Sequence, residues 1–306
     1  MSLTRRHVAR LIAGGVLGGG MASLLAACQS VPARPIPTPV NPLIKPKPEG
    51  NGIVALQASS ELALGRNRFA MGLVDAHNQA VTTGTVQIEF FKLRADGTGE
   101  KRSDSPAVFR SVGGQSKGVW VTPVEFGETG PWGAQANLVQ PGEGARTARM
   151  SFEVRDKFST PGYGEPAVRS ASLTANDVGG DVSHICTNQP PCELHMLSIA
   201  DALAPGQKPL LVSFATPALC TSATCGPELN AVVQLSKAYG DRANFIHVEI
   251  YEYPFDGQHV AKAVDEWHLP SDPWTFVVDR GGIVRDRFEG SAPAEELEPA
   301  LKALLT

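Results

Sequence analysis

The first half of the chain alternates hydrophobic and polar residues with a period of two. The clearest case is Val86-Gln87-Ile88-Glu89-Phe90, in which every second side chain is hydrophobic. Successive side chains of a β-strand point to opposite faces, so this alternation indicates a strand with one face on a core. Glycine-containing turns separate similar runs, which predict strands at 68–74, 81–91, 119–126, 132–139 and 147–154. We therefore expect residues 51–158 to form an all-β domain of two packed sheets.

The pattern changes in the last third of the chain. Leu210–Phe214 is a short, continuous hydrophobic run, as expected of a buried strand. Gly226-Pro227 then marks the start of a helix, and Gly240 marks its end. Short hydrophobic runs and helical periods continue in alternation, which predicts strands at 210–214, 244–251, 274–279 and 283–288, and helices at 226–239, 260–267 and 294–305. This order predicts an α/β domain over residues 194–306.

The first 28 residues have the features of an export signal. A basic head with Arg5, Arg6 and Arg10 precedes a glycine-rich hydrophobic run that ends in Leu25-Ala26-Ala27-Cys28. This segment resembles a bacterial lipoprotein signal, which implies removal of residues 1–27 and attachment of lipid, palmitate included, to Cys28. The pair Arg5-Arg6 also resembles a twin-arginine signal. We predict an extracytoplasmic protein that is lipid-anchored to the bacterial cell membrane; the alternative is an uncleaved membrane anchor.

The amino-acid composition predicts two linkers and argues against nucleic acid as a partner. Residues 28–50 are rich in proline and are expected to form an extended tether, and residues 159–193 are expected to link the two domains. The whole chain has a net charge of −4. Residues 1–27 contain three arginines and no acidic residue, so their removal moves the charge to −7. A mildly acidic chain without a basic run argues against nucleic acid as a partner.

The five cysteines comprise Cys28 and two locally spaced pairs. Cys220 and Cys225 fall between a predicted strand end and a predicted helix start, where partial positive charge favours a thiolate. Residues five apart do not face each other on a helix, so bonding requires Cys220 in the loop and Cys225 near the first turn. We predict that this pair is catalytic. The alternative is two buried structural thiols or a static disulfide.

The second pair is Cys186 and Cys192, in the linker. A structural disulfide is the default in an oxidising compartment, and we predict that these two residues form one. Two alternatives remain. The thiols could be unpaired or could exchange disulfides. Together with His184 and His195 they also offer the ligand types that bind zinc or copper.

From about Leu194 to Leu305 the chain resembles a thioredoxin fold of the exported redoxin kind. The resemblance rests on Phe214-Ala-Thr-Pro with Cys220 and Cys225-Gly-Pro, on Asp272-Pro-Trp-Thr-Phe-Val-Val-Asp, and on Gly282-Ile-Val. It implies that Pro273 is cis and lies against the active-site cysteines. It also implies a thiol–disulfide oxidoreductase that acts by mixed-disulfide exchange on protein thiols and disulfides. The chain departs from the family pattern in having Leu219 before the first cysteine and four residues within the pair.

The predicted fold class is accordingly an immunoglobulin-like sandwich joined to an α/β thioredoxin fold. The sandwich would lack an inter-sheet disulfide, because residues 51–158 contain no cysteine. The predicted exchange reaction needs no metal, nucleotide or flavin, so we expect no cofactor. Three other functions stay open: a thiol peroxidase similar to peroxiredoxins, a copper-handling protein that uses His247, and a tethered binding module in which both pairs are locked disulfides. The sequence gives no oligomeric state.

Overall fold

The structure is a computed structural model that describes residues 52–111, 113, 118–290 and 292–305. These residues all belong to one compact unit of the chain, Ile36–Thr306. The predicted signal peptide at 1–27, the predicted lipid site Cys28 and the tether at 28–50 lie outside the described residues. None of the described helices is both long enough and apolar enough to cross a membrane.

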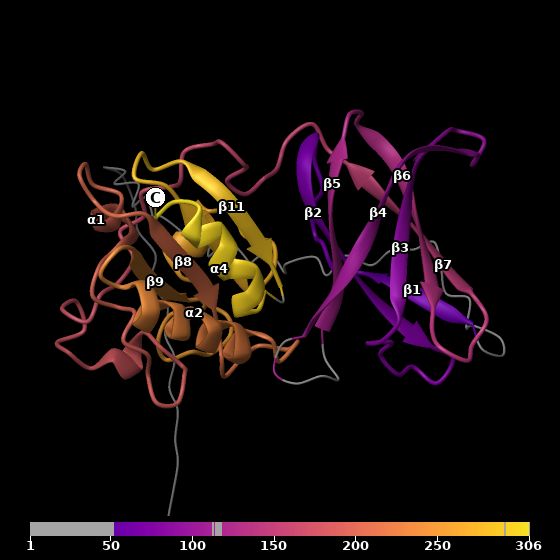
Figure 1. Ribbon diagram of the computed structural model, residues 1–306. Helices are drawn as coiled ribbons and strands as arrows, with labels where there is room; N and C mark the ends of the chain where they lie inside the picture. Colours follow the sequence, from indigo (N-terminus) through magenta and orange to yellow (C-terminus); the bar gives the residue numbers. More distant parts are fainter. Residues whose placement is uncertain (1–51, 112, 114–117, 291, 306) are drawn as a thin grey trace, which may run out of the picture. The chain divides into compact units, whose positions relative to one another are not determined.

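Seven antiparallel strands form one continuous sheet in the order β1-β2-β5-β4-β3-β6-β7 (Figure 1). The alternation predicted from sequence places Val86, Ile88 and Phe90 on its buried face. The end strands β1 and β7 lie against each other, so the sheet is nearly closed, like a barrel. The strands are β1 (Ile53–Gln57), β2 (Gly65–Asp75), β3 (Thr85–Leu93), β4 (Gly99–Ser111), β5 (Gly118–Phe126), β6 (Gly130–Val139) and β7 (Arg146–Val154).

The prediction of an immunoglobulin-like sandwich is wrong, because a sandwich consists of two separate sheets. Strand β4 joins what would be the two sheets. Its residues 99–107 pair with β3, and its residues 108–111 pair with β5. The register between β3 and β4 also shifts between Phe90 and Phe91, an irregularity that bends strands. The sequence patterns predicted β2, β3, β5, β6 and β7 but missed β1 and β4, so they did not reveal that one long strand pairs with two different neighbours.

The remainder of the described chain holds a four-stranded mixed sheet in the order β11-β10-β8-β9. Strands β8 and β9 are parallel, and the other two pairs are antiparallel. The elements are the 3₁₀ turn η1 (Val182–His184), α1 (Ile199–Ala202), β8 (Leu210–Ala215), α2 (Cys225–Tyr239), β9 (Asn244–Glu249), α3 (Lys262–Glu266), β10 (Trp274–Val278), β11 (Val284–Glu289) and α4 (Ala294–Lys302).

The predicted α/β thioredoxin fold is also wrong as a fold class, since the structure is mostly β. Strands hold 39% of the described residues and helices hold 15%. The three predicted helices are present, but two of them are shorter than expected. The helix predicted at 260–267 has only five residues, because Val260 instead bridges to Tyr251. The helix predicted at 294–305 ends at Lys302. Of the described helices, only α2 exceeds nine residues, with 15.

Strand β8 is the centre of the C-terminal sheet, and all six of its residues are buried. Helices α2 and α4 pack on one face through Leu229, Val232 and Leu297, among others. An aromatic cluster packs on the opposite face, where the ring centroids of Trp267 and Phe214 are 5.0 Å apart. The loop at 216–224, which connects the carboxyl end of β8 to α2, is therefore held between two rigid elements.

Candidate active site

The structure places Cys220 in the loop after β8 and Cys225 at the first residue of α2. This is the arrangement that the spacing requires for the two sulfurs to meet. The two Sγ atoms and a carboxylate oxygen of Asp272 all lie within 4.8 Å of one another. Thr224 precedes the helix without a side-chain capping bond, so the partial positive charge of the helix start is directed at this loop.

Cys220 is half-buried and its sulfur accepts several hydrogen bonds. The backbone N–H of Cys225 lies 3.3 Å from the Cys220 Sγ, and the Ser222 hydroxyl lies 3.2 Å from it. The neighbouring Cys225 thiol is the largest influence, and together with these donors it lowers the pKa of Cys220 to about 4. A thiol with this pKa is a thiolate at neutral pH, which is the form that attacks disulfides.

Cys225 is fully buried, and its sulfur has a different environment. Its Sγ donates to the Asp272 Oδ1 over 3.1 Å. The neighbouring Cys220 sulfur first, then burial and the charge of Asp272, raise the pKa of the Cys225 thiol. The pair is therefore unequal: Cys220 is an accessible thiolate, and Cys225 is a protonated, enclosed thiol.

Asp272 is the site residue that sequence reasoning missed. Burial raises the pKa of its carboxyl to about 6, so at neutral pH it is a carboxylate that can accept a proton from Cys225. The available signal was its position directly before Pro273, which the resemblance placed against the cysteines. The Asp272–Pro273 peptide bond is cis, as that resemblance implied. A direct role for Pro273 in catalysis stays a prediction.

Glu228 lies one helical turn after Cys225 and is fully buried. Its Oε1 accepts a hydrogen bond of 2.7 Å from the Thr275 hydroxyl. Burial raises the pKa of this carboxyl to about 8. The side chain is thus mainly neutral at pH 7, and it does not oppose the Cys220 thiolate in the way a charged carboxylate at this position would.

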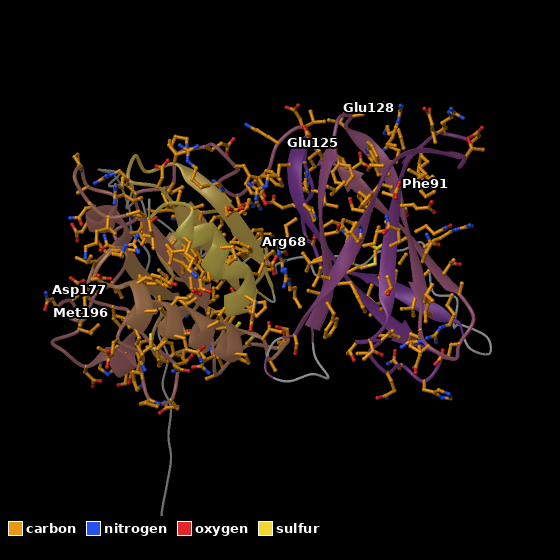
Figure 2. All side chains as sticks on the ribbon, viewed as in Figure 1. Arg68, Phe91, Glu125, Glu128, Asp177 and Met196 are labelled. Carbon is orange, nitrogen blue, oxygen red and sulfur yellow. The ribbon has the colours of Figure 1, made fainter. Side chains whose placement is uncertain are left out.

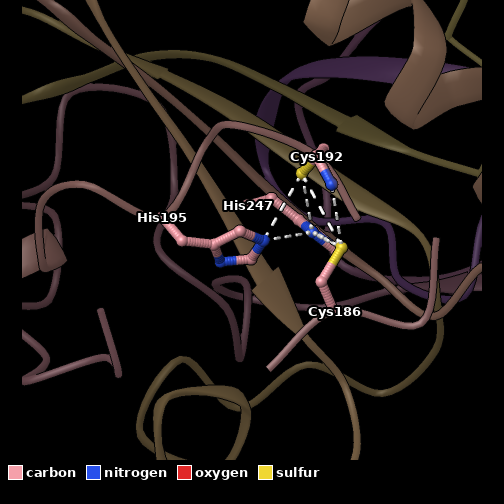
Figure 3. A group of neighbouring side chains, drawn as sticks. All are labelled: Cys186, Cys192, His195 and His247. Carbon is pink, nitrogen blue, oxygen red and sulfur yellow. Dashed lines mark hydrogen bonds between the residues drawn. The ribbon is translucent and has the colours of Figure 1, made fainter. Parts of the chain in front are cut away.

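The other cysteine pair lies in a second cluster of the same half of the chain. Cys186 and Cys192 are free thiols with sulfurs 3.8 Å apart, and the disulfide predicted between them stays a prediction. His195 and His247 complete this cluster (Figure 3). His247 was expected to be a structural histidine of its strand, or a copper ligand beside Cys220 and Cys225. His184, which the sequence analysis grouped with this pair, is not part of the cluster. Its Nε2 lies 3.7 Å from the Asp181 Oδ2.

Comparisons with known proteins give little further guidance. No protein-family model matches the chain, and no curated protein matches it. Among solved structures, a thioredoxin-family thiol:disulfide interchange protein from Chlorobium tepidum TLS is similar at 19% identity. The match covers 36% of this chain and 86% of that protein, with a TM-score of 0.28. A likeness of this size establishes neither the fold nor the activity of this chain.

Proposed function

We propose that this protein is a thiol–disulfide oxidoreductase that acts through Cys220 and Cys225. The observation that carries the proposal is the unequal pair: the partly exposed sulfur of Cys220 lies within 4.8 Å of the buried sulfur of Cys225, which is at the start of a helix. Disulfide exchange requires this difference in exposure, because one sulfur must reach the partner's disulfide and the other must then resolve the mixed disulfide. A pair of inert core thiols would be buried alike, as Cys186 and Cys192 are, whereas Cys220 is partly exposed.

The first step is attack by the Cys220 thiolate on a disulfide of the partner protein. A bond forms between the Cys220 Sγ and one partner sulfur, the partner's S–S bond breaks, and the other partner sulfur leaves as a thiolate that takes a proton from water. In the second step Cys225 gives its proton to Asp272 and attacks the Cys220 Sγ. The mixed disulfide breaks, and the first partner sulfur leaves as a thiolate.

The products are a reduced partner and a Cys220–Cys225 disulfide, so two electrons pass from this pair to the partner. Closing the bond brings the sulfurs from within 4.8 Å to about 2.05 Å. Cys220 lies in a loop, which can supply this movement, whereas Cys225 is fixed in α2. The same steps in reverse oxidise a partner dithiol.

The cellular setting is part of the same proposal. The lipoprotein-like signal in residues 1–28 supports export and a lipid anchor on Cys28, so the partners would be proteins outside the cytoplasm. Structural disulfides occur in that compartment, and thiol exchange repairs or forms them.

The decisive experiment is trapping with Cys225→Ser in the full-length protein. This variant keeps the attacking thiolate but cannot resolve the mixed disulfide. Disulfide-linked complexes with partner proteins should therefore accumulate, and dithiothreitol should release the partners. Cys220→Ser is the matched control and should form none. Wild-type protein should reduce insulin disulfides with a thiol donor. Complexes on Cys220→Ser instead would reverse the roles. Consumption of peroxide without insulin reduction would overturn the proposal in favour of a peroxidase.

A further inference from the structure

We propose that Cys186, Cys192, His195 and His247 bind one zinc ion in a closed tetrahedral site. All four side chains are buried, with exposed fractions of 1%, 8%, 2% and 1%. Their ligand atoms converge on one point, and each lies within 4.8 Å of the others (Figure 3). The site shares no residue with the cysteine pair of the proposed function.

The distances between these atoms agree with the edges of a zinc tetrahedron. Bond lengths of about 2.3 Å to sulfur and ~2.05 Å to nitrogen imply edges of roughly 3.8 Å (S–S), ~3.6 Å (S–N) and ~3.3 Å (N–N). The sulfurs are 3.8 Å apart, and the two histidine nitrogens, His247 Nδ1 and His195 Nε2, are 3.3 Å apart. Three of the four sulfur–nitrogen distances are 3.6, 3.4 and 3.4 Å, and the fourth, from Cys186 to His195, is within 4.8 Å. Each distance other than this last one agrees with its edge within about 0.2 Å.

The surroundings orient His247 for this role. Its Nε2 lies 3.0 Å from the carbonyl oxygen of Ala215, which can only accept. The proton of the neutral ring therefore sits on Nε2, and the lone pair of Nδ1 points at the two sulfurs. A histidine ligand that donates its second nitrogen to a carbonyl is the usual support of a bound metal. The backbone N–H of Cys192 likewise points at the Cys186 Sγ over 3.4 Å.

The chain also brings the ligands together across a long sequence separation. His247 is on β9, which forms one edge of the four-stranded sheet. The segment carrying the other three ligands runs along that edge, and the His247 N–H donates to the Leu194 carbonyl over 2.9 Å. Two adjacent side chains of this segment point in opposite directions. Met196 is 71% exposed (Figure 2), whereas the adjacent His195 is only 2% exposed.

Zinc fits the charge and the softness of these ligands. Two thiolates balance the charge of Zn²⁺, so a neutral unit is buried where separate charges would be costly. Two thiolates and two imidazoles in tetrahedral array favour zinc over the cations that prefer oxygen. Binding to protonated thiols releases two protons. Because four protein ligands fill the coordination sphere, the site is structural and leaves no position for a substrate.

A zinc ion here would also brace the loop that holds Cys220. Two contacts connect the cluster with that loop: His247 donates to Ala215 at the end of β8, and the Ala218 N–H donates to the Thr187 hydroxyl over 3.1 Å. Thr187 directly follows Cys186. Loss of the metal would therefore loosen the start of the loop.

The test uses full-length protein purified without reductant or chelator. Elemental analysis should find about one zinc per chain, and Cys192→Ser and His247→Gln should lose it. Cys220→Ser is the matched control, because it makes the same change in the other pair and should keep the zinc. In metal-free wild-type protein, added Co²⁺ should give the visible bands of a tetrahedral site and thiolate charge-transfer bands. This spectrum tests the proposal even if the variants do not fold.

Several outcomes would overturn the proposal. A Cys186–Cys192 disulfide in the purified protein, found by peptide mapping, would restore the predicted disulfide in its place. Copper or iron in the site would refute the choice of metal. Zinc that is lost from Cys220→Ser but retained by Cys192→Ser would assign the ion to the other cluster. Failure of insulin reduction with zinc still bound would refute the proposed function and leave the zinc site standing.

Discussion

The pKa of Cys220 gives the sharpest test of the candidate site. We expect the rate at which iodoacetamide alkylates Cys220 in the reduced protein to rise around pH 4 and to be nearly constant above pH 6. An ordinary cysteine, with a pKa of about 8.5, would instead gain close to tenfold in rate per pH unit through neutrality. Peptide mass spectrometry separates the signal of Cys220 from that of the buried cysteines.

The perturbation is Cys225→Ala, which removes the largest influence on that pKa. A hydrogen bond to a charged group contributes about 1.5–3 kcal/mol. Cys220 is only half-buried and a thiol is a weak donor, so solvent screening places the loss at the low end or below. Since one pKa unit corresponds to about 1.4 kcal/mol, the midpoint should move up by roughly one unit.

Cys225→Ser is the matched control. Serine keeps an O–H donor at the same place, so its midpoint should stay closer to that of the wild type than to that of Cys225→Ala. All three proteins should react at similar rates at pH 8, where Cys220 is ionised in each. A wild-type midpoint near pH 8.5, or one that Cys225→Ala leaves unchanged, would refute the electrostatic reasoning.

Three further predictions concern the candidate site and the hydrophobic core. The pKa of Glu228 is raised from 4.5 to about 8, so between these values the folded state holds a proton that the unfolded state has lost. Stability should fall by up to about 1.4 kcal/mol per pH unit as pH rises through that window, and Glu228→Gln should abolish this slope in urea unfolding. Asp272→Asn should slow resolution of the mixed disulfide in stopped-flow experiments without slowing alkylation of Cys220. Phe90→Ala should cost about 3–5 kcal/mol in chemical denaturation, because its ring packs 5.1 Å from that of another phenylalanine. The neighbouring Phe91 is only partly buried, and truncating it should cost ~1 kcal/mol.

Local features of the sequence predicted most of the strands and helices, although they missed β1 and β4. The alternation around Ile88 identifies a strand, and glycine and proline near Cys225 identify the start of α2. Both features depend on residues close together in the chain. The fold class failed because it depends on pairing over long distances. Strand β4 has a mostly polar sequence, and its pairing with both β3 and β5 cannot be read from its own residues.

The same limit explains what was found and missed in the two cysteine clusters. Each pair was visible from its spacing, but its chemistry is set by a residue from a distant segment. Asp272 lies 47 residues after Cys225 and receives its thiol hydrogen bond. His247 lies 55 residues after Cys192, with its Nδ1 3.4 Å from that sulfur.

Cysteine spacing alone does not distinguish the functions of the two pairs. Their neighbours do, because one pair lies beside a carboxylate and the other lies beside two imidazoles. A carboxylate can take a proton from a thiol and so supports repeated exchange at an accessible sulfur. Two neutral imidazoles supply lone pairs that, with two thiolates, enclose a metal and keep both sulfurs from exchange. The assignment of function therefore depends on Asp272 and His247 as much as on the cysteines.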